Sequence, residues 1–444
     1  YKYIFSFYFF NDTICVKVRW EITADLCFIS EFRMQLLTLA SVSKVLTEDV
    51  IDKVFKIKTN SLDNVVSVEV SRGAAAGEGL ISAVYRIKVT GDQHTASFFA
   101  KALVQNPLLQ RSVPCKIFFK REIVFFTQIL PVFIDIQKTL GAKECIRNNV
   151  PEFYAYHQDG INDYILMEDL SEKELIPVSV LPTKFERNST LKILAHFHAV
   201  SLALRVKKPD VFENITSGMN ELYYNEGKRE WYAKYLQRAI DIDKKVLMEF
   251  EGINDMYIQK FEELVKDDVY GQLIKLSSTR GDHPVVNHGD AWTPNFLCSK
   301  NKVVAIDFQL VRCASPATDL SYFLSLCCDK YSNKDDFFES VEVYYNALDY
   351  YLKDMRLKSK EVFSFDMLKE ELTKYGKFGI LASLTSIPLL ASERCDVLQS
   401  FEEQYSDCEK IPLEELWPLT PITSEEHKLK LVNTVRVGVD VGLF

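Results

Sequence analysis

The spacing of apolar residues changes near residue 167, and this change constrains the fold more than any other feature of the chain. Before it, apolar and polar residues alternate over short stretches, which is the period-two pattern of half-buried strands. After it, apolar residues recur every three or four positions over long stretches, as they do on helices. We therefore expect an α+β fold with two lobes, a small β-rich one followed by a large helical one.

The expected elements of the first lobe run in the order helix, hairpin, helix, hairpin. The middle helix should end before Pro131, because proline lacks the N–H that a helix interior needs. Each hairpin joins two alternating stretches across a turn. The predicted ranges are residues 36–55 for the first helix, 83–89 and 97–104 for the first hairpin, 116–130 for the second helix, and 152–157 and 163–167 for the second hairpin.

Helical patterns dominate the rest of the chain, with one β interruption at residues 284–311. Inside it, residues 295–298 and 303–306 are expected to pair across a polar turn, and Asp307 follows the second strand. The predicted helices cover residues 190–204, 222–250, 338–352 and 366–384.

These patterns divide the chain into four parts. We expect residues 1–33 to be an N-terminal extension, since their short aromatic run only faintly resembles a targeting signal. Residues 34–167 form the first lobe, residues 168–430 the second, and residues 431–444 a C-terminal tail.

Composition excludes several classes of protein. The net charge is -9 and no basic stripe is present, so we expect no nucleic-acid partner. No apolar run reaches the roughly 20 residues of a membrane span. The ten cysteines include no CxxC pair, which favours reduced thiols and a cytoplasmic location. The oligomeric state is left open.

The β interruption carries the residues best suited to chemistry. His288, Gly289 and Asp290 stand in its first loop, and Asn295 and Asp307 stand at strand ends. Phosphoryl transfer needs a carboxylate that orients the attacking hydroxyl and oxygen ligands for Mg²⁺. We therefore expect Asp290 to be the base and Asn295 and Asp307 to hold the metal. Turn capping would explain any one of these residues, but it explains the set poorly.

Lys101 and Glu122 form a second candidate pair. Lys101 lies on an expected strand on the same face as Phe99 and Leu103, and Glu122 lies in the following helix beside phenylalanines. Each charge is costly to bury alone, so the two are expected to pair. The pair is interpreted as a lysine that grips phosphates and a glutamate that positions it. An ordinary structural ion pair is the alternative.

A glycine-rich turn precedes the first hairpin and includes Gly73, Gly77 and Gly79. Such a turn lets backbone N–H groups approach phosphates closely. Glycines are common in loops, so this signal is weak by itself. No GxxxxGK[ST] motif is present, which argues against a P-loop enzyme. The histidines at 196 and 198 face different sides of one helix and are interpreted as structural.

Taken together, these motifs resemble the ecdysteroid kinase-like proteins of insects, a branch of the choline kinase and aminoglycoside phosphotransferase superfamily. The matching segments run in family order over residues 45–420: the glycine-rich turn with residues 82 and 84–86, Lys101, residues 119–122, 168–170, 194–199, 288–292, Asn295, 306–309 and 319–320.

The resemblance implies a protein-kinase-like bilobal fold and a kinase that uses ATP and Mg²⁺. It further implies a small hydroxylated acceptor, such as an ecdysteroid or a dietary xenobiotic. By the same resemblance, Asp290 is the base, Lys101 and Glu122 are catalytic, and Asn295 and Asp307 are both catalytic and metal-binding. The nucleotide would contact Gly77, Gly79, Ser82, Lys101, Met167, Glu168 and Leu170.

Three other functions are weighed against this one. A protein kinase is disfavoured because Gly289 stands where His-Arg-Asp has arginine, and Gln309 stands where Asp-Phe-Gly has glycine. A choline- or ethanolamine-type kinase would need a cage for a cation. An inactive kinase-like binding protein is the third alternative. The aromatic residues of segment 206–280 fit either a core or an acceptor pocket.

Overall fold

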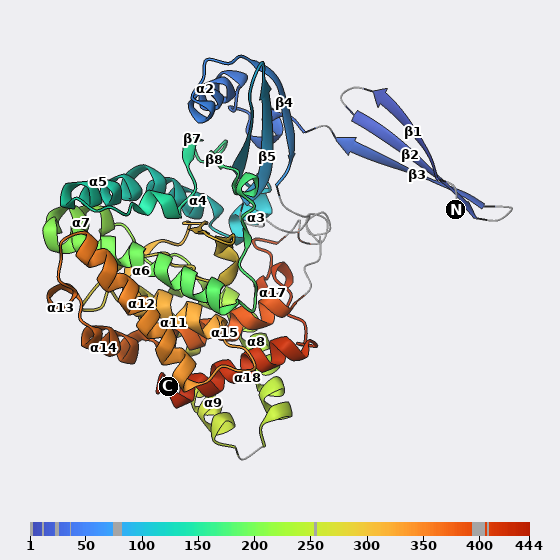
Figure 1. Cartoon of the computed structure of the whole chain (residues 1–444). Helices are drawn as coiled ribbons and strands as arrows, with labels where there is room; N and C mark the ends of the chain where they lie inside the picture. The colour runs from blue at the N-terminus through green and yellow to red at the C-terminus, as the bar shows by residue number, and fades with distance from the viewer. Residues whose placement is uncertain are drawn as a thin grey trace.

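The computed structural model describes residues 3–10, 13–22, 26–35, 37–73, 82–252, 255–392, 405 and 408–444 (Figure 1). Near the N-terminus, strands β1 (Tyr3–Phe10), β2 (Thr13–Ile22) and β3 (Leu26–Gln35) form an antiparallel meander. Within the described part of the chain, this meander pairs with no other sheet.

A five-stranded antiparallel sheet forms the body of the small lobe, in the order β4-β5-β6-β8-β7. Both expected hairpins are confirmed, and β4 is a strand that the sequence analysis did not identify. The strands are β4 (Val65–Arg72), β5 (Ser82–Gly91), β6 (Thr95–Leu103), β7 (Phe153–His157) and β8 (Tyr164–Glu168).

The two faces of the five-stranded sheet pack against different parts of the protein, as the residues of β6 show. Phe98, Ala100 and Ala102 are buried in a cluster with α1 (Leu39–Val42) and α2 (Glu48–Thr59). Alternation therefore turns Lys101 toward the opposite face, where Leu103 packs against the main core. The expected single helix over residues 36–55 is instead two helices. Ser43 ends the first because it is extended and its hydroxyl donates to Asn162 O at 2.7 Å.

The helix between the hairpins does not stop at Pro131, so that prediction is wrong. Helix α4 (Cys115–Val124) continues through a π-helical turn at Phe125–Ile129 into α5 (Leu130–Leu140). In this turn the Leu130 N–H bonds five residues back, to Phe125 O. Because a π-helical turn is wider than an α-helical turn, Pro131 can follow it at the start of α5 without interrupting the continuous helix.

The large lobe is helical and packs around one extended core. Helix α6 (Lys184–Lys207) lies beside α12 (Lys334–Asp354) along its length. The remaining helices are α3 (Pro107–Ser112), which precedes α4, then α7 (Pro209–Thr216), α8 (Arg229–Phe250), α9 (Met256–Lys266), α10 (Val269–Ser278), α11 (Pro316–Leu326), α13 (Ser359–Val362), α14 (Phe365–Tyr375), α15 (Lys377–Ala391), α17 (Leu413–Leu416) and α18 (Glu425–Asp440).

Two expected helices in this lobe have different bounds, and part of the segment expected to be a C-terminal tail is helical. The helix expected from Leu222 begins at Arg229. The helix expected over residues 366–384 is broken at Gly376, where a Cβ would stand 2.4 Å from Leu372 O. The boundary expected at residue 431 falls inside α18, whose Leu431 and Val435 are fully buried. Residues 431–440 therefore belong to the helical core.

The expected β interruption is confirmed. Strands β11 (Phe296–Cys298) and β12 (Val303–Ala305) pair antiparallel, and β9 (Ile176–Pro177) joins the other edge of β11. Strand β10 (Val285–Asn287) pairs with β13 (Arg312–Ala314). The loop after β12 lies where the lobes meet, because Asp307 in this loop contacts Lys101 of the five-stranded sheet.

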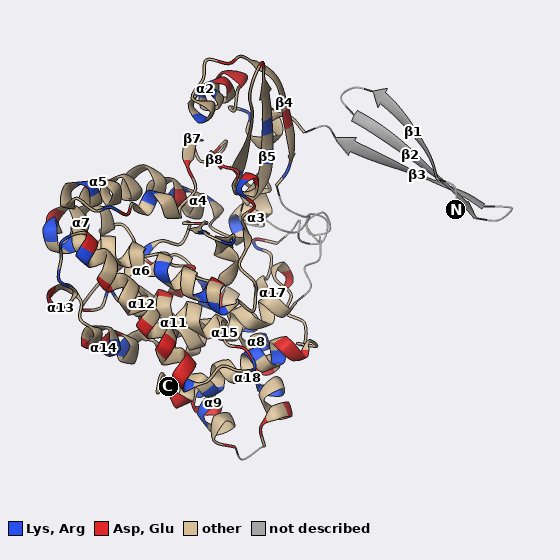
Figure 2. Ribbon diagram, viewed as in Figure 1, with Lys and Arg blue, Asp and Glu red and all other residues tan. Residues whose placement is uncertain are grey.

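The structure as a whole is an α+β fold with two lobes, as expected. Basic and acidic residues are interspersed along the helices of the large lobe (Figure 2). Among the described residues, every helix is too short or too polar to cross a membrane.

Candidate active site

One lysine joins the two lobes. Lys101 Nζ on β6 donates to both carboxylate oxygens of Glu122 at 2.9 Å and to Asp307 Oδ1 at 3.1 Å. Burial alone would lower the pKa of Lys101, but Asp307 and Glu122 together raise it above its ordinary value. The ammonium group is therefore held charged between one carboxylate from each lobe.

Asp307 sits at a strained point of the chain, directly after β12. Its φ of 65° is left-handed, a conformation that is unusual for a residue with a side chain. The next residue, Phe308, is buried and stacks on Phe125 with 3.7 Å between ring centroids. Because Phe125 belongs to the π-helical turn, the irregular turn supplies the surface that fixes Phe308 and, through it, Asp307.

The loop after β10 is held by hydrogen bonds to a buried carboxylate. Asp319, at the start of α11, accepts the backbone N–H of His288 at 2.6 Å and that of Gly289 at 3.1 Å. Gly289 has a φ of 85°, and a Cβ there would stand 1.9 Å from Leu310 O. Only glycine fits this position, so the sequence His288-Gly289-Asp290 sets the path of the loop.

Asp290 and Asn295 contact each other within this loop. Asn295 Nδ2 donates to Asp290 Oδ2 at 2.9 Å and to Asp290 O at 3.1 Å. Burial, together with the nearby charge of Asp307, raises the pKa of Asp290 to about 7, while the bond from Asn295 opposes this shift. No group of the described residues donates a hydrogen bond to the amide oxygen of Asn295.

His288 packs under the site as a neutral ring. Its Nε2–H donates to Ile306 O at 3.0 Å, and its Nδ1 accepts the Asp290 N–H at 3.4 Å. Burial lowers the pKa of His288. The two bonds fix the tautomer and tie the Asp290 loop to the strand that leads to Asp307.

The two histidines of α6 are structural, as expected. His198 Nε2 lies 3.2 Å from Asp319 Oδ2, and its Nδ1 lies 2.8 Å from the hydroxyl of Tyr344. His196 stacks on Tyr351 with 3.9 Å between ring centroids. His198 therefore supports the carboxylate that holds the His288 and Gly289 backbone.

The sequence analysis missed a buried network of two arginines and one glutamate. Arg312 donates to Gly289 O at 2.6 Å, and its Nε lies 3.4 Å from Glu221 Oε2. Arg121, the residue before Glu122, donates to Val311 O at 2.7 Å and to Gly218 O at 3.1 Å. Arginines are usually exposed, so no local pattern distinguishes these two from surface residues.

The connection between the lobes contains three residues expected to contact nucleotide. Met167, Glu168 and Leu170 are all buried where β8 leads into the large lobe. Glu168 forms an ion pair with Lys173, and Asp169 with Arg86 at 2.6 Å. Ser82 begins β5 opposite Leu103. Gly77 and Gly79 lie outside the described residues.

Most aromatic residues of segment 206–280 lie in the core. Tyr232 and Tyr235 are buried, with ring centroids 5.4 Å apart, and burial raises the pKa of both hydroxyls. Tyr224 and Tyr270 pack against Tyr232. Of the two possibilities that the sequence left open, the core explains these tyrosines.

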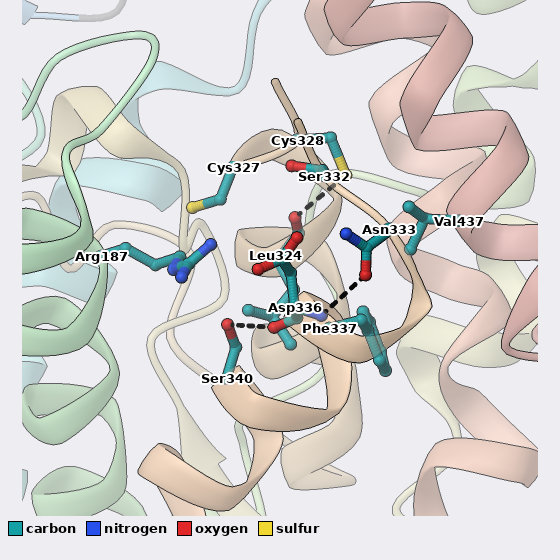
Figure 3. Close-up of a pocket in the computed structure, with 10 residues that line it drawn as sticks. All are labelled: Arg187, Leu324, Cys327, Cys328, Ser332, Asn333, Asp336, Phe337, Ser340 and Val437. Carbon is teal, nitrogen blue, oxygen red and sulfur yellow. Dashed lines mark hydrogen bonds between the residues drawn. The ribbon is translucent and has the colours of Figure 1, made fainter. Parts of the chain in front are cut away.

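A small pocket of about 20 Å³ between α6, α11 and α12 contains two neighbouring thiols, Cys327 and Cys328 (Figure 3). Burial raises the pKa of Cys327 to about 12 and that of Cys328 to about 11. Both groups are therefore protonated and poor nucleophiles. Free thiols also occur at Cys115, Cys145, Cys298, Cys313 and Cys408.

A sequence model of the ecdysteroid kinase-like family matches residues 76–357, which is more than half of the chain. No curated protein matches the chain.

Three solved structures are similar in their overall path. Choline kinase from Cryptosporidium parvum Iowa II is 11% identical, with a TM-score of 0.38 over 78% of this chain and 92% of that one. Plasmodium vivax ethanolamine kinase is 12% identical, with a TM-score of 0.38 over 78% and 83%. An amicoumacin kinase in complex with AMP-PNP and Ca²⁺ is 16% identical, with a TM-score of 0.38 over 86% and 97%.

The family match spans both lobes and includes Lys101, Glu122, Asp290, Asn295 and Asp307. The chain belongs to the ecdysteroid kinase-like family and is a small-molecule kinase.

Proposed function

We propose that the protein transfers the γ-phosphate of ATP to a hydroxyl group of a lipophilic small molecule, such as an ecdysteroid or a dietary xenobiotic, with Mg²⁺ as cofactor. The observation that carries the proposal is the contact of Lys101 with both Glu122 and Asp307. This contact supports the proposal because the Lys101 ammonium lies beside the Asp307 carboxylate, whose charge also acts on Asp290.

The donor atoms near Asp307 suit Mg²⁺. The described residues contain no group of three histidine, cysteine or acidic side chains that would hold a metal alone. Mg²⁺ prefers oxygen ligands and takes only one or two from protein when phosphates supply the rest. Asp307 and the amide oxygen of Asn295 provide such a set. Bound Mg²⁺ and ATP would supply the phosphoryl group and neutralise the charge that develops during transfer.

Asp290 is proposed to orient the acceptor hydroxyl and take its proton. Its loop is fixed by Asp319 and Arg312, and Asn295 holds one of its carboxylate oxygens, which leaves the other for the acceptor. Lys101, positioned by Glu122, is proposed to bind phosphate oxygens, as are backbone groups near Ser82, Gly77 and Gly79. Met167, Glu168 and Leu170 are proposed to border the adenine.

The acceptor is proposed to be neutral rather than cationic. Arg312 is 3% exposed and lies close enough to Asp290 to lower the pKa of its carboxyl. Glu221 pairs with this guanidinium, so its charge does not decide between the two classes of acceptor. The family description favours a steroid alcohol, which is uncharged.

A screen of purified enzyme tests the proposal through ADP release from ATP. Hydroxylated steroids, plant glycosides, choline and ethanolamine would be compared, with Asp290→Asn as the inactive control. We expect turnover with a lipophilic alcohol. Turnover with choline alone would contradict the acceptor class. Binding of Mg-ATP without turnover on any acceptor would instead indicate a binding protein.

A further inference from the structure

A second pocket, of about 350 Å³, lies between α3, the start of α4, the start of α8 and the segment before α17. It shares no residue with the proposed catalytic site. Its lining contains four cationic side chains and no carboxylate, although acidic residues outnumber basic ones by 62 to 53 in the whole chain. The four are Arg111, Lys116, Lys228 and Lys410.

Two of these cations donate to backbone oxygens. Arg111 Nε donates to Glu409 O at 3.3 Å, and Lys228 Nζ donates to Leu222 O at 3.3 Å. Among the described residues, none of the four cations has a carboxylate oxygen within ion-pair distance. The lining residues that the structure describes therefore carry more positive than negative charge.

Lys228 is the least solvated of the four. Its ammonium lies 5.1 Å from the ring centre of Phe118 and 5.6 Å from that of Tyr223. Burial lowers the pKa of Lys228 to about 8, and the charge of Glu221 opposes this only in part. An anion in the pocket would offset that cost, because it favours the charged form.

The start of α4 adds to the positive field. Pro114 is the N-cap residue and offers no side-chain acceptor to the first N–H groups. The first turn contains no acidic residue. Pro114, Lys116 and Ile117 all line the pocket, so the positive end of the helix dipole lies at its wall.

The opposite wall is fixed and partly apolar. Trp231 Nε1 donates to Ile411 O at 2.8 Å, and Ile411 N donates to Ser112 Oγ at 2.8 Å. These bonds tie α3, α8 and the segment before α17 together. Since the indole N–H is already used, Trp231 offers only ring surface to a ligand.

We propose that this pocket binds a small organic anion, whose phosphate, sulfate or carboxylate group meets the four cations while a flat apolar body lies against Trp231. Cationic side chains select the charged group, and the ring together with Ile117 selects the apolar part. The proposal does not depend on the kinase reaction, because it rests on residues outside the catalytic site.

The test is calorimetric titration of the full chain with naphthalene-2-sulfonate, whose charge does not titrate. We expect one site per chain that weakens between about 50 mM and 200 mM salt. Lys228→Met and Lys116→Met should each weaken binding about tenfold, which equals roughly 1.4 kcal/mol. Lys116 is exposed, so its variant remains informative if Lys228→Met folds poorly.

Two controls make the test specific. Lys234→Met removes an exposed lysine of α8 that does not line the pocket, and this variant should bind the sulfonate as wild type does. The neutral analogue naphthalene-2-carboxamide should bind about tenfold more weakly than the sulfonate. Equal binding of the two compounds would overturn the proposal. So would binding that survives both pocket variants but is lost in Lys101→Met, because the anion would then occupy the catalytic site.

Discussion

Lys101 contacts two carboxylates that stand far apart in the sequence, and each plays a different part. Glu122 takes two hydrogen bonds from the ammonium and is almost fully buried, so it fixes the lysine. Asp307 takes one bond and is partly exposed, so it remains available to another ligand. This difference supports a positioning role for Glu122 and a metal-binding role for Asp307.

Lys101 and Glu122 should behave as one unit in kinetics. In a double-mutant cycle with Lys101→Met and Glu122→Gln, we expect an interaction energy of about 1 kcal/mol or more in kcat/KM, because either change leaves the other group misplaced. Purely additive losses would show that the two residues act independently.

At the residue scale, the sequence indicated which side chains contact one another in the candidate site. It did not indicate the buried groups that hold these side chains in position. Lys101, Glu122, Asp290, Asn295 and Asp307 stand in local patterns that strand alternation and loop position make visible. Arg121, Glu221 and Arg312 act through contacts between distant segments. Their burial depends on tertiary packing that no local pattern records.

Helix α4 is tied to the large lobe by the residue next to its glutamate. The guanidinium of Arg121 binds carbonyl oxygens of Gly218 and Val311, and Val311 lies shortly after Asp307. Contacts with both lobes therefore fix the position of Glu122. Helix α4 is anchored to the large lobe as well as to the small one.

Arg121→Met should lower kcat by about ten- to a hundredfold while changing the KM for ATP little, because it disturbs the placement of Glu122 and not the nucleotide contacts. Lys120→Met, which changes the exposed neighbouring residue, is the matched control and should be near wild type. Arg121→Lys should restore part of the rate. A purely structural role predicts instead a lower unfolding midpoint with unchanged kcat.

Asp243 on α8 is a buried acid without a partner. It is fully buried, and neither carboxylate oxygen has a hydrogen-bond partner among the described residues. Burial raises its pKa well above the ordinary value of 3.8. Such a group binds its proton more tightly in the folded chain than in the unfolded chain. It therefore lowers the free energy of unfolding increasingly as the pH rises above the unfolded pKa.

The variant Asp243→Asn has no ionisable group at this position, so it should not lose stability in this way as the pH rises. We expect the free energy of unfolding of the variant to rise relative to wild type by roughly 1 to 3 kcal/mol as pH increases from about 4 to 8. Urea unfolding at several pH values measures the difference. A gap that stays constant with pH would mean that the folded and unfolded chains bind this proton equally tightly, so that folding does not raise the pKa of Asp243.

At the element scale, most predicted strands and helices are present, and the errors concern where elements end. Pro131 was expected to end a helix, yet a π-helical turn continues the helix past it. Ser43 ends α1, where its hydroxyl donates to Asn162 O, and the helix expected over residues 366–384 divides at Gly376. Periodicity shows which face is apolar, but it does not show where tertiary contacts break or extend an element.

At the scale of the whole molecule, the proposed catalytic side chains of both lobes lie where the two lobes meet. The small lobe contributes Lys101 and Glu122, and the large lobe contributes Asp290, Asn295 and Asp307. One core extends from the large lobe into α4, α5 and one face of the five-stranded sheet, and a second core covers the other face of that sheet. The bilobal division follows from the sequence, because the change of periodicity near residue 167 coincides with the connection between lobes.

Calorimetric titration with Mg-ATP tests the shared site most directly, using wild type, Asp290→Asn and Asp307→Ala. Wild type and Asp290→Asn should bind Mg-ATP with similar affinity, because Asp290 is proposed to act on the acceptor alone. Asp307→Ala should bind at least about tenfold more weakly and should lose its dependence on Mg²⁺. Unchanged Mg-ATP affinity in folded Asp307→Ala would contradict the assignment of this cluster as the catalytic site.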